Sequence, residues 1–196
     1  MRRTVYRISP TFILVTINVA VYLYTSLIGS NFLYTTDYVL RIYGQSASAI
    51  LQNGRYWQLI TSMFVHVNIA HVASNMFFLL IFGLRAEDFF TDAEYYLVYC
   101  TSGFAGNLLS LLYAFYPHNV TSAGASGAIF GLFGAVIIYL RKVVERSILG
   151  ALIFAFMFFL ITISASTNIY AHFGGLVAGL LIGYWLAHKR QISINY

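Results

Sequence analysis

The chain has 196 residues, of which 60% are hydrophobic and only 9% are charged. A soluble domain carries about 25% charged residues, so this composition excludes a soluble globular fold and indicates a membrane protein. The net charge of +5 comes from basic residues between hydrophobic runs and at both chain ends. Because these residues form no basic patch interleaved with aromatic side chains, we expect no nucleic-acid partner.

Six apolar runs are long enough, or nearly so, to cross a bilayer core of about 30 Å as helices of about 20 residues. They cover residues 11–28, 69–83, 92–113, 126–140, 147–164 and 170–188. No small-residue cleavage site follows the first run, so we interpret that run as a retained helix rather than a signal peptide. No linker or repeat interrupts the chain. Residues 1–196 are therefore expected to form one all-α membrane domain of six helices.

Two of these helices have recognisable starts. Thr91 and Glu94 have the spacing of a capping box before the third run, and Asn68 is a plausible N-cap of the second. The lone cysteine, Cys100, excludes an internal disulfide, and its place in an apolar run predicts a small buried packing residue.

The distribution of Lys and Arg predicts the orientation of the helices. With six spans both termini lie on one side, and the positive-inside rule places the more basic loops in the cytoplasm. A cytoplasmic N-terminus puts nine basic residues inside and only Arg41 and Arg55 outside. We therefore expect cytoplasmic termini. The short chain without targeting sequences favours the plasma membrane of a prokaryote.

Two segments depart from a simple pattern of spans. The first outer connection, residues 31–67, is rich in aromatic and aliphatic residues, so part of it is expected to lie in the membrane interface. The fourth run has about 15 residues and would extend only about 22 Å as a helix. Its start is therefore expected below the outer surface, beside a cavity open to the outside.

That start carries the sequence Gly124-Ala125-Ser126-Gly127. Glycines permit a tight turn, and a helix start offers free N–H groups and a positive dipole end, which suit an oxyanion. Ser126 is thus a candidate nucleophile. The alternative is a serine N-cap in a glycine-rich turn.

His172 lies in the last apolar run, where an ionisable side chain is a functional candidate. It shares one helix face with Gly175, Leu176, Gly179 and Gly183, and small residues at this spacing allow close helix contact. The fourth run offers a matching face of Gly127, Gly131 and Gly134. His172 could then reach Ser126 as a general base, oriented by packing against Phe130. A histidine bonded to a carbonyl is the alternative.

His71 and Asn75 occupy positions i and i+4 of the second run, so they share a helix face and could donate hydrogen bonds to an oxyanion. His66 precedes this helix and is expected to bond to loop backbone. A metal site of His66, His71 and His172 is the rival interpretation, but the spacing is poor and no carboxylate is near. No Asp lies deep within a span, which argues against an aspartate-based membrane protease. A Ser–His–Asp triad is not expected either, because Asp37 is the only acid in the outer connections and lies far back in the first of them.

This set of residues resembles the rhomboid family of intramembrane serine proteases. The matching pieces span nearly the whole chain, in the order Trp57, His66, His71-x-x-x-Asn75, Glu87, Gly124-x-Ser126-Gly127 and Ala171-His172-x-Gly174-Gly175-x-x-x-Gly179. Three departures stand out. Gln58 follows Trp57 where the family has Arg, Ser62 stands where bacterial members often have a histidine, and Phe130 replaces a tyrosine.

The resemblance implies a Ser–His dyad of Ser126 and His172. It also implies an oxyanion hole of His71, Asn75 and the Ser126 N–H, with Gly124 shaping the turn. Glu87 would bind loop backbone at the inner end of the second helix. The expected substrates are single-span membrane proteins, cut near the outer face without cofactor or metal. A non-catalytic relative that binds membrane clients, and a channel or small transporter, are the alternative functions.

Overall fold

The computed structural model describes residues 8–115, 121–143, 149–150, 153 and 168–194. In chain order the elements are α1 (Pro10–Gly29), α2 (Asp37–Tyr43), β1 (Gln45–Ser46), α3 (Ala47–Asn53), α4 (Gln58–Thr61), α5 (Ile69–Glu87), α6 (Asp92–Leu109), the 3-10 helix η1 (Ser110–Phe115), β2 (Thr121–Ser122), α7 (Ser126–Val143) and α9 (Ile169–Ile194). Five of these, with η1 continuing α6, are long and apolar enough to cross a membrane. They match five of the six expected spans, and the span expected at 147–164 lies almost entirely outside the described residues.

Both helix starts expected from the sequence are confirmed. The Asn68 side chain accepts a hydrogen bond from the His71 N–H at the start of α5. Thr91 and Glu94 form a complete capping box at the start of α6, each side chain accepting from the backbone N–H of the other. Side chains thus satisfy one free N–H group at the start of α5 and two at the start of α6.

The α7 helix lies at the centre of the bundle and is longer than expected. It has 18 residues, about 27 Å at about 1.5 Å per residue, because Arg141, Lys142 and Val143 continue the helix beyond Leu140. Basic side chains are favourable near the negative end of a helix dipole, which accounts for the extra turn. The helix thus ends three residues beyond the approximate boundary expected at residue 140, and its length gives no argument for a sunken start.

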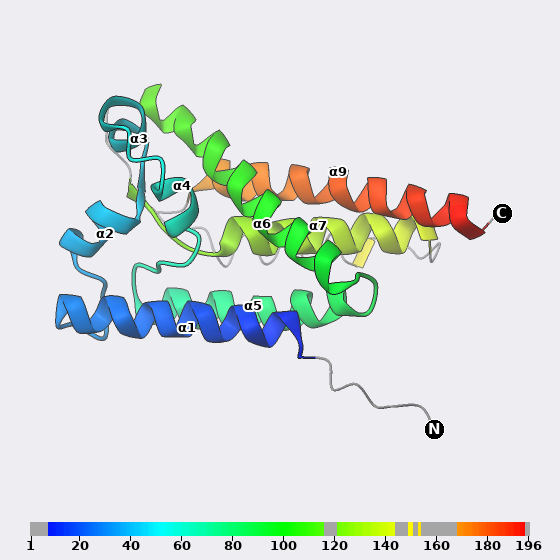
Figure 1. Ribbon diagram of the computed structural model, residues 1–196, viewed down its shortest axis with the longest axis horizontal. Helices are drawn as coiled ribbons and strands as arrows, with labels where there is room; N and C mark the ends of the chain where they lie inside the picture. Colours follow the sequence, from blue (N-terminus) through cyan, green and yellow to red (C-terminus); the bar gives the residue numbers. More distant parts are fainter. Residues whose placement is uncertain (1–7, 116–120, 144–148, 151–152, 154–167, 195–196) are drawn as a thin grey trace.

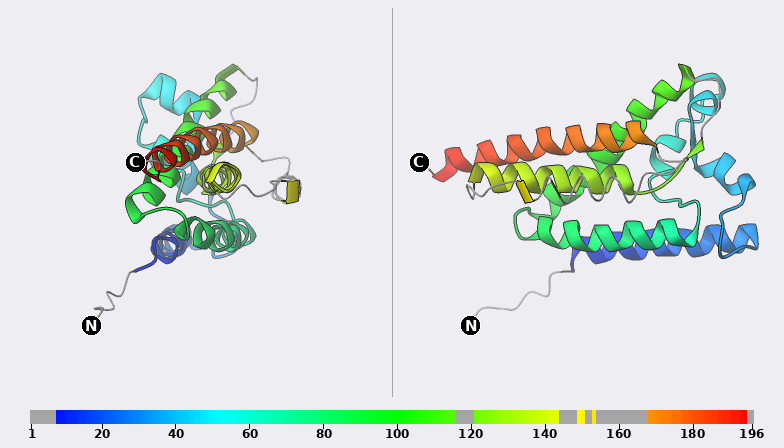
Figure 2. Two further views of the ribbon diagram at one scale, coloured as in Figure 1. Left: turned by 90° about the vertical axis from the view of Figure 1, so that its right-hand side faces the viewer. Right: turned by 180° about the vertical axis from the view of Figure 1, so that it is seen from behind.

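Figures 1 and 2 show α9 beside α7, α6 crossing both, and α1 paired with α5 on the opposite side of α7. In the most apolar part of α7, 67% of the residues are buried, against 28% in α1. A helix buried on most sides forms the core, whereas α1 has a broad face left for lipid.

Cys100 on α6 is exposed rather than buried, so the expectation of a buried packing cysteine was wrong. It lies on a face of α6 that the other described helices leave exposed.

The two helices that begin with Ser126 and Ile169 run parallel and touch through their backbones. A Cβ atom placed on Gly175 would lie 2.1 Å from the Gly127 carbonyl oxygen, and one on Gly179 would lie 2.0 Å from that of Gly131. Such distances are far inside van der Waals contact, so only glycine fits. The packing face expected from the glycine spacing is confirmed, and this contact brings the start of α7 beside the start of α9.

The connection between α1 and α5 is structured. It contains three short helices, and β1 pairs antiparallel with β2 through Gln45 opposite Ser122. Several of its large apolar side chains are exposed, as expected for a segment at the membrane interface: Phe32, Leu33, Tyr34, Tyr38, Leu51, Tyr56, Trp57 and Ile60. Aromatic rings are favourable at that depth.

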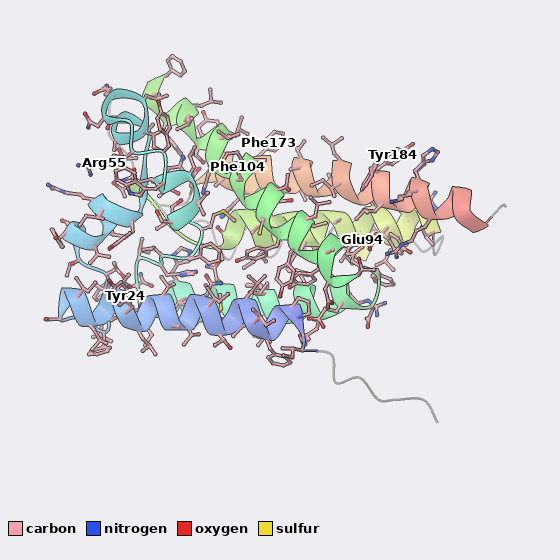
Figure 3. The ribbon with its side chains drawn as sticks, in the orientation of Figure 1. Tyr24, Arg55, Glu94, Phe104, Phe173 and Tyr184 are labelled. Carbon is pink, nitrogen blue, oxygen red and sulfur yellow. The ribbon has the colours of Figure 1, made fainter. Side chains whose placement is uncertain are left out.

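Charged side chains gather at the end of the bundle where α1 begins and α9 ends. The Glu87 carboxylate accepts from the Ser9 hydroxyl and, at 2.9 Å, from the Thr11 N–H, so it binds the first turn of α1 rather than a loop. At the same end the Arg190 guanidinium pairs with Glu94 at 2.6 Å. Figure 3 shows Glu94 there and Arg55 at the opposite end.

The backbone contact between α7 and α9 predicts a large effect of a single methyl group. Gly179→Ala must push the helices apart, and we expect it to lower the free energy of unfolding by about 1–3 kcal/mol, as overpacking does. Thermal unfolding in detergent measures the loss. Gly150→Ala is the matched control, because its Cβ position has no atom within 4 Å. Equal melting temperatures for the two variants would contradict the packing argument.

Candidate active site

Ser126 is the first residue of α7, and the turn before it requires glycine. Gly124 has a φ of 138°, in the range that favours glycine, and its N–H donates to the Ser62 carbonyl oxygen at 2.8 Å. A Cβ on Gly124 would lie 2.7 Å from Cε1 of His71. The short strand β2 leads into this turn. The local backbone therefore presents Ser126 at the helix start with the His71 ring beside the turn.

His172 lies in the first turn of α9, directly opposite Ser126. Its Nε2 is 2.7 Å from the Ser126 Oγ, a hydrogen-bond distance between a serine hydroxyl and an imidazole nitrogen. The imidazole packs on the ring of Phe130, one turn along α7, with centroids 4.7 Å apart and planes inclined by 31°. His172 is almost fully buried, with 4% of its surface exposed. The geometry expected for these three residues is confirmed.

His66 supports the turn from behind. Its Nε2 accepts from the Ala125 N–H at 3.4 Å, and its Nδ1 lies 3.2 Å from the Phe64 carbonyl oxygen. These two bonds agree with a neutral ring that carries its proton on Nδ1. Burial, and then the neighbouring His71, lower the pKa of His66 to about 3. His66 thus bonds to loop backbone, as expected, and holds the residue before Ser126.

His71 and Asn75 project from α5 toward the same region. The His71 ring packs edge-on against His66 with centroids 5.2 Å apart. The Asn75 Nδ2 donates one hydrogen to the His71 carbonyl oxygen at 2.9 Å, which leaves its second hydrogen for another acceptor. The buried His71 Nδ1 and Asn75 Oδ1 have no hydrogen-bond partner within the part of the chain that the structure describes. Polar atoms of this kind are suited to bind a polar group of a ligand.

Gln58 and Ser62 depart from the family pattern, yet both side chains still anchor the chain around them. The Gln58 Nε2 donates to the Arg41 carbonyl oxygen at 2.9 Å, and its Oε1 accepts from the Ser46 N–H at 3.1 Å. The Ser62 Oγ accepts from Asn107 at 2.9 Å. Gln58 thus joins segments of the first outer connection to one another, and the bond between Ser62 and Asn107 fastens this connection to α6. Sequence reasoning missed Asn107, although an amide within an apolar run was a signal that could have singled it out.

A metal centre finds no support in the described residues. Among them no three His, Cys, Asp or Glu side chains are arranged to hold a metal ion. Both ring nitrogens of His66 are used in hydrogen bonds to the backbone. Glu87 binds α1 at the other end of the bundle and takes no part in this site.

The buried neutral state of His66 predicts a pH dependence of stability. Its folded pKa of about 3 lies below the value of about 6.5 for an unfolded histidine, so the stability that the neutral ring contributes is present above about pH 6.5 and is lost as the pH falls toward 3. His66→Gln retains an acceptor for the Ala125 N–H but does not titrate. We expect thermal melts at pH 7 and pH 4.5 to differ less for this variant than for the wild type. An equal pH dependence would contradict this assignment.

Comparison of the sequence with known proteins places the chain in a family. A family model described as a rhomboid domain matches residues 53–189. RHOMBOID-like protein 6, mitochondrial, of Arabidopsis thaliana is 37% identical over 72% of this chain and 47% of its own length. The putative rhomboid protease YdcA of Bacillus subtilis is 31% identical over 71% of each chain.

Rhomboid protease GluP of the same bacterium is 33% identical over 74% of this chain, and the match covers 29% of that protein. The chain therefore spans about half, or less, of some of these relatives. With five apolar helices and a family match over residues 53–189, the chain is a multi-pass membrane protein that belongs to the rhomboid family.

Proposed function

We propose that this chain is an intramembrane serine endopeptidase that cleaves transmembrane segments through a dyad of Ser126 and His172. The observation that carries the proposal is the 2.7 Å approach of the His172 Nε2 to the Ser126 Oγ inside a helical membrane protein. A nucleophile within hydrogen-bond reach of a base is the signature of covalent catalysis. The names of the B. subtilis relatives, rhomboid proteases, support the same activity.

The chemical steps follow from this geometry. The Ser126 oxygen attacks the carbonyl carbon of the scissile peptide bond while its proton passes to the His172 Nε2. His172 then donates that proton to the leaving amine, and the C–N bond breaks to give an ester on Ser126. A water molecule, deprotonated by His172, attacks the ester. The second product leaves as a carboxylic acid and Ser126 regains its proton.

Negative charge on the carbonyl oxygen would develop beside three donors. The Ser126 N–H lies at the start of α7, where the positive end of the helix dipole favours an anion. The Asn75 Nδ2 has one hydrogen to spare, and the His71 side chain lies against the turn that precedes Ser126. Donors fixed in advance stabilise the transition state because they need no reorganisation.

His172 is oriented here by packing. The Phe130 ring packs against one face of the imidazole, and the side chain is almost fully buried. Asp37, the single acid in the outer connections expected from the sequence, begins α2. Ring packing would thus take the role that an aspartate has in a serine protease triad.

The proposed topology has six spans, with residues 1–196 as one domain and both termini in the cytoplasm. It is supported by the gathering of Glu87, Glu94 and Arg190 at the end where α1 begins and α9 ends, while Ser126 and His172 lie in the first turns of their helices at the other end. Single-span membrane proteins in the bilayer would be cut near the outer face, without cofactor or metal. The plasma membrane of a prokaryote is the proposed location.

Loss of either dyad residue is expected to abolish cleavage. Purified wild type, Ser126→Ala and His172→Ala are compared on a single-span model substrate, in detergent and in liposomes. We expect a rate loss of about 10⁴-fold or more in both variants, because the two groups act as a unit. Binding of the substrate without cleavage by the wild type would instead favour a non-catalytic client-binding protein.

The oxyanion hole predicts a smaller loss that falls on kcat. Asn75→Ala removes one donor, and a single donor contributes about 10²–10³-fold to kcat. The Michaelis constant should stay nearly unchanged, because the charge develops only in the transition state. The control is Ser74→Ala, at the residue before Asn75. It removes a hydroxyl that donates to the His71 carbonyl oxygen. A rise in KM with unchanged kcat would place Asn75 in substrate binding.

A further inference from the structure

Asn168, the residue just before α9, is the centre of a buried hydrogen-bond cluster that the chemical steps above do not use. Only 7% of its surface is exposed. Its Oδ1 accepts from the Ala171 N–H at 2.9 Å, and its backbone oxygen accepts from the His172 N–H at 3.2 Å. Asn168 therefore caps the helix that carries His172. Its side chain binds the Ala171 N–H and its backbone oxygen binds the His172 N–H.

The other side of the same amide binds two segments of the chain outside α9. The Asn168 Nδ2 donates to the Ser122 Oγ in β2 and to the Ser110 Oγ at the start of η1, both at 2.8 Å. Every hydrogen-bonding position on the nitrogen is then used, since an amide has two N–H hydrogens. The Ser110 hydroxyl donates in turn to the Gly106 carbonyl oxygen at 2.8 Å, which fixes its direction.

The bond to Ser122 joins the two segments that lead to the dyad. Ser122 stands four residues before Ser126, and Asn168 stands four residues before His172. The glycine contacts between α7 and α9 begin where Gly127 lies against Ala171 and Gly175, so they hold the first turns of the two helices together but do not include the segments that enter them. A single buried amide links these two entering segments directly.

We propose that Asn168 is a positioning residue that sets the distance between Ser126 and His172 by holding the entry to α7 against the cap of α9. This proposal rests on the proposed protease function. Reacting groups need a near-attack geometry, and a displacement of about 1 Å can lower the rate by about 10²-fold. An amide that acts as cap and bridge together prevents the two helix starts from separating.

Two variants separate the bridge from the cap. Asn168→Ser retains a good N-cap side chain but is too short to reach Ser122 and Ser110, and Ser122→Ala removes the bridge from its other end. We expect both to lower kcat, and the rate at which a fluorophosphonate probe labels Ser126, by about tenfold or more, with KM changed less than about twofold. Ser110→Ala, which loses the bond to η1 and leaves the bond to β2, should show a smaller loss.

A double variant tests whether Asn168 and Ser122 act through one bond. If they do, Asn168→Ser combined with Ser122→Ala should lose no more activity than Asn168→Ser alone, because residues that share one interaction are not additive. Losses that multiply would overturn the proposal.

A control variant separates positioning from a general loss of stability. Tyr95→Phe removes a hydrogen bond of 3.0 Å to Thr11 at the other end of the bundle. It should lower the melting temperature without slowing the labelling of Ser126. The comparison is made between variants that lose the same melting temperature. If the Asn168 and Ser122 variants then slow the labelling of Ser126 no more than Tyr95→Phe does, the positioning role is wrong.

The experiment also separates failure of this proposal from failure of the proposed function. Wild-type protein that labels at Ser126 and cleaves, with unchanged rates in the Asn168→Ser and Ser122→Ala variants, overturns the positioning role alone. Wild-type protein that neither labels nor cleaves overturns the protease assignment and this proposal with it.

Discussion

The close backbone contact between α7 and α9 is the constraint on which the site depends. Gly175 and Gly179 lie against the carbonyl oxygens of Gly127 and Gly131, so the two helices approach as closely as their backbones permit. Within lipid there is no hydrophobic force between helices, and packing of small residues is what holds them together. Because α7 and α9 run parallel, the contact places their first turns side by side. Ser126 and His172 meet for this reason, although 46 residues separate them.

The end of the bundle that holds Ser126 is organised by uncharged polar groups, and the other end by charged ones. Amides and hydroxyls of Gln58, Ser62 and Asn107 bind backbone and each other around the turn that leads into α7. Glu87 and the pair of Glu94 with Arg190 hold the opposite end. Buried neutral groups cost less to desolvate than ions, so they can line a site inside the membrane. Ions are better placed where water reaches them.

Much of this arrangement could be predicted from the sequence, because it rests on local patterns. The glycine spacing gave the face of α9, the capping box gave the start of α6, and Phe130 followed from its place one turn after Ser126. The end of α7 was harder to predict. The low hydropathy of Arg141 and Lys142 indicated a loop, yet basic side chains are favourable in the last turn of a helix. Cys100 was misread because an apolar run does not distinguish a core face from a lipid face. Asn168 was missed because its partners, Ser110 and Ser122, are distant in sequence.

The choice of histidine at position 66 follows from the same balance of burial and charge. The Ala125 N–H is buried and needs an acceptor, and an acidic side chain there would be a buried ion beside His71. A carboxylate so close would favour protonation of His71, and the site would then hold two charges that burial disfavours. A neutral imidazole accepts the same hydrogen bond without adding charge. The nucleophile turn is thus supported by a group that leaves the electrostatics of the proposed dyad to Ser126 and His172 themselves.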